Sequence, residues 1–173
     1  QQMLSFLLRL VGTYTDMLHL GKVFHAPLEM RHLPGYASRE PDILFVAREH
    51  LDRITADRLE GPADLVIEIA SESTAALDRR EKLWEYQRSG IREYWIIDPR
   101  PGKQIASFYQ RGADGTFHLV ALDTQGRYHS AVLAGFWLKP AWLWQGTLPN
   151  PTLMFLEIRG LSPEAIQVFR RDV

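Results

Sequence analysis

A carboxylate lies within one of the most apolar segments of the chain, and this combination strongly restricts the possible folds. Residues 64–69 read DLVIEI, and such a near-continuous apolar run is typical of a central strand covered on both faces. Side chains alternate along a strand, so Glu68 shares a face with Val66, opposite to Ile67. An ionised carboxylate there loses hydration, which costs several kcal/mol unless a cation or strong hydrogen bonds compensate. Glu68 therefore indicates a functional site, with an arginine pair or a strand-end position as the structural alternative.

The segments around this strand predict an α/β fold. Apolar residues recur at helical spacing over residues 3–20, and Gly21 is expected to end that helix. A short apolar strand is expected at 43–46, a helix at 78–89 and a third strand at 93–97. Together these elements predict a single domain, with a mixed, strongly bent sheet and the two helices packed against it.

The remaining segments predict a hairpin and a C-terminal helix. Strands at 105–110 and 117–122 flank the turn 112–115, whose glycines and aspartate are typical of a hairpin. The other expected elements are an irregular or edge strand within 23–30, a strand at 128–133, a short tryptophan-containing cap at 136–144 and a last helix that begins at Ser162.

Composition excludes several classes of site. The chain has no cysteine, which excludes disulfides and thiolate metal sites and is consistent with a cytoplasmic protein. No apolar run reaches the length of a membrane span, so no membrane association is expected. No phosphate loop or dinucleotide fingerprint is present, so no small organic cofactor is expected. The net charge is −1, so any contact with nucleic acid must come from a local basic patch.

Asp42 is a second candidate acid. It follows Pro41 at the start of the strand expected at 43–46, where an aspartate is commonly part of a turn. If this strand pairs beside residues 64–69, the carboxylates of Asp42 and Glu68 can share a hard divalent cation. Mg²⁺ or Mn²⁺ would suit such oxygen ligands.

The helix after the Glu68 strand carries a candidate lysine. Asp78, Lys82 and Tyr86 are spaced i, i+4, i+8 and share one helical face. In the functional interpretation, Lys82 leans back over the strand end and orients a water or stabilises charge on a phosphate. In the structural interpretation, Asp78 caps the helix together with Glu81, and Lys82 is an ordinary solvated side chain.

Basic and aromatic residues give a weaker signal for nucleic-acid binding. Arg79 and Arg80 begin a group that includes Arg88 and Arg92, and a plain solvated face is the default interpretation of such a group. If the patch is functional, Arg79 and Arg80 are the expected contacts. The tryptophans at positions 137, 142 and 144 are expected in the core or an interface, not in a base-stacking platform.

The order of these motifs resembles the Uma family, whose members are described as putative restriction endonucleases of the PD-(D/E)XK nuclease superfamily. The resemblance covers most of residues 1–145 and is densest over 61–99. It leaves 146–173 as a C-terminal extension, with a short helix expected to pack on the same domain. It is carried by Pro41-Asp42, the run GPADLVIEIAS at 61–71, Ser73-Thr74, Asp78, Lys82, Tyr86 and the run GIREYWIIDP at 90–99.

The resemblance implies a role for each candidate. Asp42 would be the metal-binding aspartate of the PD motif, and Glu68 the second metal-binding acid. The superfamily usually places its lysine two residues after the second acid, where this chain has Ala70. The family moves the lysine to the following helix, which matches Lys82, with Asp78 and Tyr86 in support. The implied protein is a Mg²⁺- or Mn²⁺-dependent endonuclease that hydrolyses DNA, expected by analogy to be a homodimer.

One departure from the family keeps other functions open. Family members generally have an acidic N-terminal segment ahead of the first helix, whereas this chain starts at or near that helix. The chain is therefore expected to lack its natural N-terminus or to be a fragment, and its site could be incomplete. The alternative functions are a non-catalytic nucleic-acid-binding or assembly module that retains the nuclease fold, and a hydrolase of another phosphate ester.

Overall fold

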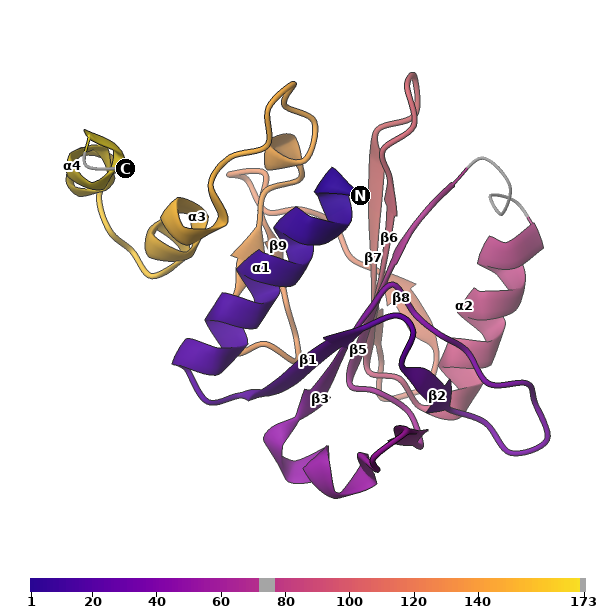
Figure 1. Ribbon diagram of the computed structural model, residues 1–173. Coiled ribbons are helices and arrows are strands. Elements are labelled where there is room, and N and C mark those ends of the chain that lie inside the picture. The colour runs from indigo at the N-terminus through magenta and orange to yellow at the C-terminus, as the bar shows by residue number, and fades with distance from the viewer. Residues whose placement is uncertain (72–76, 172–173) are drawn as a thin grey trace.

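A six-stranded mixed sheet forms the centre of the protein (Figure 1). The computed structural model describes the backbone of residues 1–71 and 77–171; the side chains of 77–79, 163 and 169–171 lie outside the description. Strands β5 and β6 are parallel, and the other neighbouring pairs are antiparallel. In spatial order the strands are β1 (Gly21–His25), β3 (Ile43–Ala47), β5 (Leu65–Ile69), β6 (Glu93–Asp98), β7 (Ile105–Arg111) and β8 (Phe117–Leu119).

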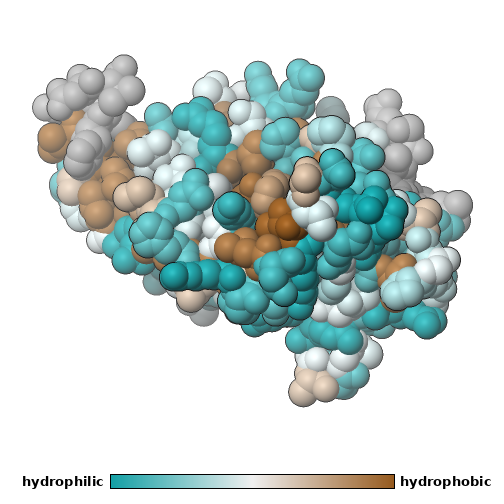
Figure 2. Space-filling view, turned by 60° about the horizontal axis from the view of Figure 1, so that its bottom comes forward, coloured by the Kyte–Doolittle hydropathy of each residue, from teal (hydrophilic) through white to brown (hydrophobic). Residues whose placement is uncertain are grey.

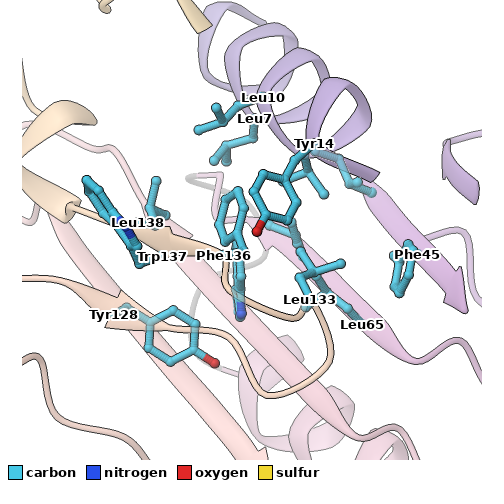
Figure 3. Close-up of a cluster of buried hydrophobic side chains, with 14 of the residues drawn as sticks. Leu7, Leu10, Tyr14, Phe45, Leu65, Tyr128, Leu133, Phe136, Trp137 and Leu138 are labelled. Atoms are coloured by element: carbon cyan, nitrogen blue, oxygen red, sulfur yellow. The ribbon is translucent and has the colours of Figure 1, made fainter. Parts of the chain in front are cut away.

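Helix α1 (Gln2–Met17) covers one face of this sheet and builds the larger part of the core. Figure 3 shows Leu7, Leu10 and Tyr14 of this helix directed toward Leu133 and Phe136. The Tyr14 hydroxyl donates a hydrogen bond to the carbonyl of Ala134 at 2.8 Å. The apolar side of this amphipathic helix therefore closes one face of the sheet to solvent.

Helix α2 (Leu77–Ser89) covers the opposite face and forms the crossover between the parallel strands β5 and β6 (Figure 1). Its Tyr86 packs in a second apolar cluster with Val66 and Tyr94. Leu65 and Ile67, in contrast, belong to the cluster beneath α1. The alternation expected along β5 is thus confirmed, and it directs Glu68 toward α2.

The role expected for Gly21 is wrong. Helix α1 ends at Met17, and the chain turns at His19, whose φ is 52°. Gly21 instead begins β1, where a Cβ atom would lie 2.1 Å from the carbonyl oxygen of Val46. A glycine is required there because β1 approaches β3 closely, not because a helix ends.

The structure contains short elements that the sequence did not reveal. Among them, β4 pairs in parallel with β2, and α3 begins after Asn150, whose side chain accepts from the Thr152 N–H. Trp137 and Trp142 are buried in the core, as expected. The remaining elements are β2 (Glu29–Arg31), η1 (Arg48–Arg53), β4 (Arg58–Glu60), β9 (Tyr128–His129), β10 (Trp137–Leu138), η2 (Pro140–Trp142), α3 (Pro151–Ile158) and α4 (Pro163–Arg171).

The segment after residue 145 contains two helices where one was expected. Met154 and Ile158 of α3 are buried in the same apolar cluster as the inner face of α1. Figure 2 shows the molecule turned so that the bottom of Figure 1 comes forward; this surface is largely hydrophilic, with apolar side chains gathered near its centre and toward the C-terminal helices. None of the helices in the described part of the chain has the length and apolar character needed to cross a membrane.

Candidate active site

Glu68 lies near the carboxyl end of β5 and meets two side chains of α2. Its Oε1 accepts a hydrogen bond from the Tyr86 hydroxyl at 2.9 Å, and its Oε2 lies 3.1 Å from the Lys82 Nζ. Lys82 and Tyr86 are one helical turn apart, so the same face of α2 delivers both groups. Lys82 therefore leans over the strand end rather than into solvent, with only 18% of its side chain exposed.

Asp42 reaches the same end of β5 from the neighbouring strand. The antiparallel pairing of β3 with β5 ends with Ile43 opposite Ile67, and Asp42 and Glu68 are the next residues along the two strands. The Asp42 Oδ2 accepts a hydrogen bond from the Ile69 N–H at 2.7 Å. This bond ties the start of β3 to β5 and holds the Asp42 carboxylate beside Glu68.

Opposing influences act on the Glu68 carboxyl group. Burial raises the pKa of Glu68 most, and the negative charge of Asp42 raises it further. The Lys82 ammonium and the Tyr86 hydroxyl lower that pKa, but the net direction is upward. Burial and the Glu68 charge also raise the pKa of Tyr86, which therefore keeps its proton and remains a donor.

A second group of polar residues connects α2 to the segment between β2 and β3. The Arg39 guanidinium donates two hydrogen bonds to Glu85, at 2.9 and 2.8 Å, and these bonds hold the pKa of Glu85 below its usual range. His32 is buried, with its Nε2 3.4 Å from Glu85 and its ring edge-on to Tyr86. No spacing in the sequence connects these three polar residues, so sequence reasoning missed them.

The other predicted contacts are less defined. The roles expected for Asp78 and Arg79 fall on side chains outside the described residues. Arg80 is exposed on the surface of α2. Its expected contact with nucleic acid remains a prediction.

Glu93 is a second buried acid that the sequence analysis did not single out. It lies on the α1 side of β6, and burial raises its pKa. Its carboxylate is surrounded by hydrogen-bond donors at 2.7 to 3.0 Å, so it holds the segment 130–132 against the sheet and has a structural role. The donors are the Trp95 Nε1, the hydroxyls of Tyr128 and Ser130, and the backbone N–H groups of Ala131 and Val132.

The carboxylate oxygens of Asp42 and Glu68 are ligands that suit a hard divalent cation. Each carboxylate oxygen retains lone-pair capacity beyond the hydrogen bonds described above. Among the side chains that the structure describes, which exclude that of Asp78, no group of three or more His, Cys, Asp or Glu could hold a metal ion. Mg²⁺ is compatible with two carboxylates, because it keeps several waters and often binds proteins through only one or two such ligands. A cation there would also relieve the repulsion that raises the pKa of Glu68.

Replacing Tyr86 with phenylalanine tests the electrostatics of the site. The loss of the hydroxyl removes a hydrogen bond that favours the ionised form of Glu68, so the pKa of Glu68 is expected to rise further. An NMR titration of ¹³C-labelled glutamate side chains measures this shift. Tyr36→Phe, at an exposed position, is the control and should leave the titration of Glu68 unchanged. An unchanged or lower pKa in Tyr86→Phe would contradict the assigned hydrogen bond.

The α/β sheet with carboxylates at one strand end and a lysine on the crossover helix is the architecture expected of a restriction-endonuclease-like protein. The family model described as "Putative restriction endonuclease" (Uma2) matches residues 1–141, and the chain belongs to this family. The resemblance inferred from the sequence is therefore confirmed. No curated protein matches the chain.

A solved structure supports the fold assignment. The chain is similar to a crystal structure from Anabaena variabilis described as "a putative nuclease belonging to DUF820", with a TM-score of 0.63. The two are 16% identical, and the match covers 83% of this chain and 78% of that chain. At this identity the likeness concerns the fold, and it confirms the expected α/β class.

Proposed function

We propose that the protein is an endonuclease that hydrolyses phosphodiester bonds of DNA with the help of Mg²⁺ or Mn²⁺. The observation that carries the proposal is the meeting of Asp42, Glu68 and Lys82 at one end of β5. Membership of the restriction endonuclease family supports it. By analogy with restriction enzymes that place one active site on each strand, a homodimer is the proposed assembly.

Each residue has a distinct task in this proposal. Asp42 and Glu68 would hold the cation, which when bound polarises the phosphate and lowers the pKa of a bound water. Lys82 places a positive charge where a phosphate gains negative charge in the transition state. Tyr86 fixes the orientation of the Glu68 carboxylate through its hydrogen bond. Arg39 and Glu85 keep α2 in position over the sheet.

A nicking assay with Lys82→Met tests the proposal. Wild-type protein is expected to relax supercoiled plasmid in Mg²⁺, and the variant is expected to be about 100-fold slower because a charge that stabilises the transition state is lost. The pH profile of the variant should also move upward, because Lys82 lowers the pKa of Glu68. Lys103→Met, in an exposed turn, is the matched control and should cleave at the wild-type rate.

The same assay separates nuclease activity from the non-catalytic alternative. The net charge of −1 is the observation that favours a binding or assembly module. Wild-type protein that binds DNA but never nicks it in Mg²⁺ or Mn²⁺ would support that alternative. Equal cleavage by wild type and Lys82→Met would show that the assigned site is not the source of the activity.

A further inference from the structure

Helix α2 carries a second stripe of side chains, on the side facing away from Glu68. Arg80, Trp84 and Arg88 are spaced i, i+4, i+8 and are exposed, whereas Lys82 and Tyr86 face the sheet. The indole of Trp84 is 45% exposed, and the Arg88 guanidinium carbon lies 4.7 Å from the centre of its ring. One helix therefore presents the proposed catalytic lysine on one face and a basic–aromatic–basic stripe on another.

A second exposed aromatic residue faces this stripe. Tyr36 lies in the loop between β2 and β3, is also 45% exposed, and its ring centre is 5.9 Å from that of Trp84. The ion pair of Arg39 with Glu85 fixes this loop against α2, and Figure 1 shows the loop beside the helix. The two aromatic rings are thus held at a defined separation by residues that are themselves anchored.

A hollow of about 390 Å³ opens over this part of the helix. It is lined by Arg80, Glu81, Trp84 and Glu85. The carboxylate of Glu85 is paired with Arg39, whereas the exposed carboxylate of Glu81 also borders the hollow. The positive charge that an anionic ligand would meet there comes from Arg80 and Arg88. The Arg88 guanidinium lies over one part of the Trp84 ring, so a base would stack on the aromatic surface that stays exposed. An arginine beside that surface can bind the phosphate of the same nucleotide.

The hollow is also well placed relative to the proposed active site. Trp84 and Lys82 are two residues apart on α2 and lie on roughly opposite sides of it. A helix with its side chains is about 10–12 Å across, so a strand of a few nucleotides reaches from one side to the other. A base held at Trp84 and the phosphate cut beside Glu68 can therefore belong to the same DNA molecule.

We propose that Trp84 and Tyr36, flanked by Arg80 and Arg88, form a stacking site for unpaired bases of the DNA substrate. This inference rests on the proposed nuclease function and adds a preference for DNA with unpaired bases, such as those that negative supercoiling exposes in a plasmid. Stacking on an aromatic face tolerates any base, so the site supplies affinity for unpaired DNA without reading its sequence.

Binding of a fluorescein-labelled 12-nucleotide oligothymidylate, followed by anisotropy in EDTA, tests the inference without cleavage. Trp84→Ala is expected to weaken binding about tenfold or more, because alanine removes the stacking surface. Trp84→Phe keeps an aromatic face and should remain within about threefold of wild type. Leu119→Ala, at a 65% exposed apolar position on β8, is the control and should bind as wild type does. Affinity for a blunt duplex of the same length should be nearly the same in all four proteins.

Three results would overturn the stacking site: no binding of the oligothymidylate by wild type, equal affinity of wild type and Trp84→Ala, or an equal loss of affinity for single-stranded and duplex DNA. Circular dichroism of each variant shows whether the helix is intact. Failure here is distinct from failure of the proposed function. If wild type nicks plasmid but Trp84→Ala binds oligothymidylate as wild type does, only the stacking site is ruled out. If wild type binds oligothymidylate through Trp84 but does not nick plasmid, only the catalytic proposal is ruled out.

Discussion

Replacing Glu68 with glutamine is expected to abolish metal-dependent cleavage while leaving the fold intact. Glutamine has nearly the same shape, and its carbonyl oxygen still accepts the hydrogen bond from Tyr86. It has no charge with which to bind a divalent cation, so cleavage in Mg²⁺ should fall by at least about 10³-fold. Plasmid nicking at increasing Mg²⁺ concentration measures the loss, and chelation of the metal should reduce wild-type protein to the same background.

Glu49→Gln is the matched control for this experiment, because the Glu49 side chain is 64% exposed in η1 and lies outside the Asp42–Glu68–Lys82 cluster. It should nick plasmid at the wild-type rate. Cleavage by Glu68→Gln at an undiminished rate would rule out the proposed metal site, even if cleavage itself were real.

The pH dependence of stability gives an independent readout for Glu68. Its pKa in the folded protein is raised, so the folded state holds this proton more tightly than the unfolded chain does. Protonated Glu68 therefore adds to the free energy of unfolding at low pH. This contribution is lost as the pH rises through the pKa that Glu68 has in the folded protein. Glu68→Gln removes this dependence, so the variant should lose less stability than wild type as pH is raised over that interval. Urea unfolding at a series of pH values measures the difference.

Replacing Glu93 with alanine is expected to cause the largest loss of stability among the changes considered. The substitution leaves the five donors that converge on this carboxylate without an acceptor in a buried region. Unsatisfied buried groups of this kind are each costly, and a total loss of about 3–5 kcal/mol is expected. For a chain of this length that corresponds to a fall in Tm of about 10 °C.

The control for this prediction is Glu157→Ala. Glu157 forms one partly exposed ion pair with Lys139 at 3.0 Å, and removing such a pair should cost less than about 1 kcal/mol. Differential scanning calorimetry compares the three proteins. Similar Tm values for Glu93→Ala and Glu157→Ala would show that the buried hydrogen bonds of Glu93 do not stabilise the fold as inferred.

The sequence predicted the central elements of the fold because their signals are local. The apolar run around Ile67 and the helical periodicity before Met17 are each visible within a few residues, and both elements are present. Short elements were missed for the opposite reason. Strand β4 has three residues and is stabilised by pairing with β2, which lies far from it along the chain. Gly21 was given the wrong role because its requirement comes from the approach of Val46, a contact between strands.

The residues of the candidate site also differ in how far the sequence alone reveals them. Glu68 could be singled out from sequence alone, since a carboxylate in an apolar strand needs compensation wherever the strand lies. Asp42 and Lys82 needed the family resemblance, because an aspartate after proline and a lysine on a helix are common in ordinary structural roles. No sequence pattern pointed to Arg39 or Trp84, because their partners, Glu85 and Tyr36, come close to them only when the chain folds.

The sequence by itself therefore determined the α/β class, the strand that carries Glu68 and the face of the helix that carries Lys82. These follow from periodicity, which depends on the geometry of single elements. Only the tertiary structure decided that Asp42 lies beside Glu68, that Lys82 closes the site, and that Arg39 holds α2 in place. Those facts depend on strand register and on contacts between distant segments, which the packing of the whole chain selects and no local pattern encodes.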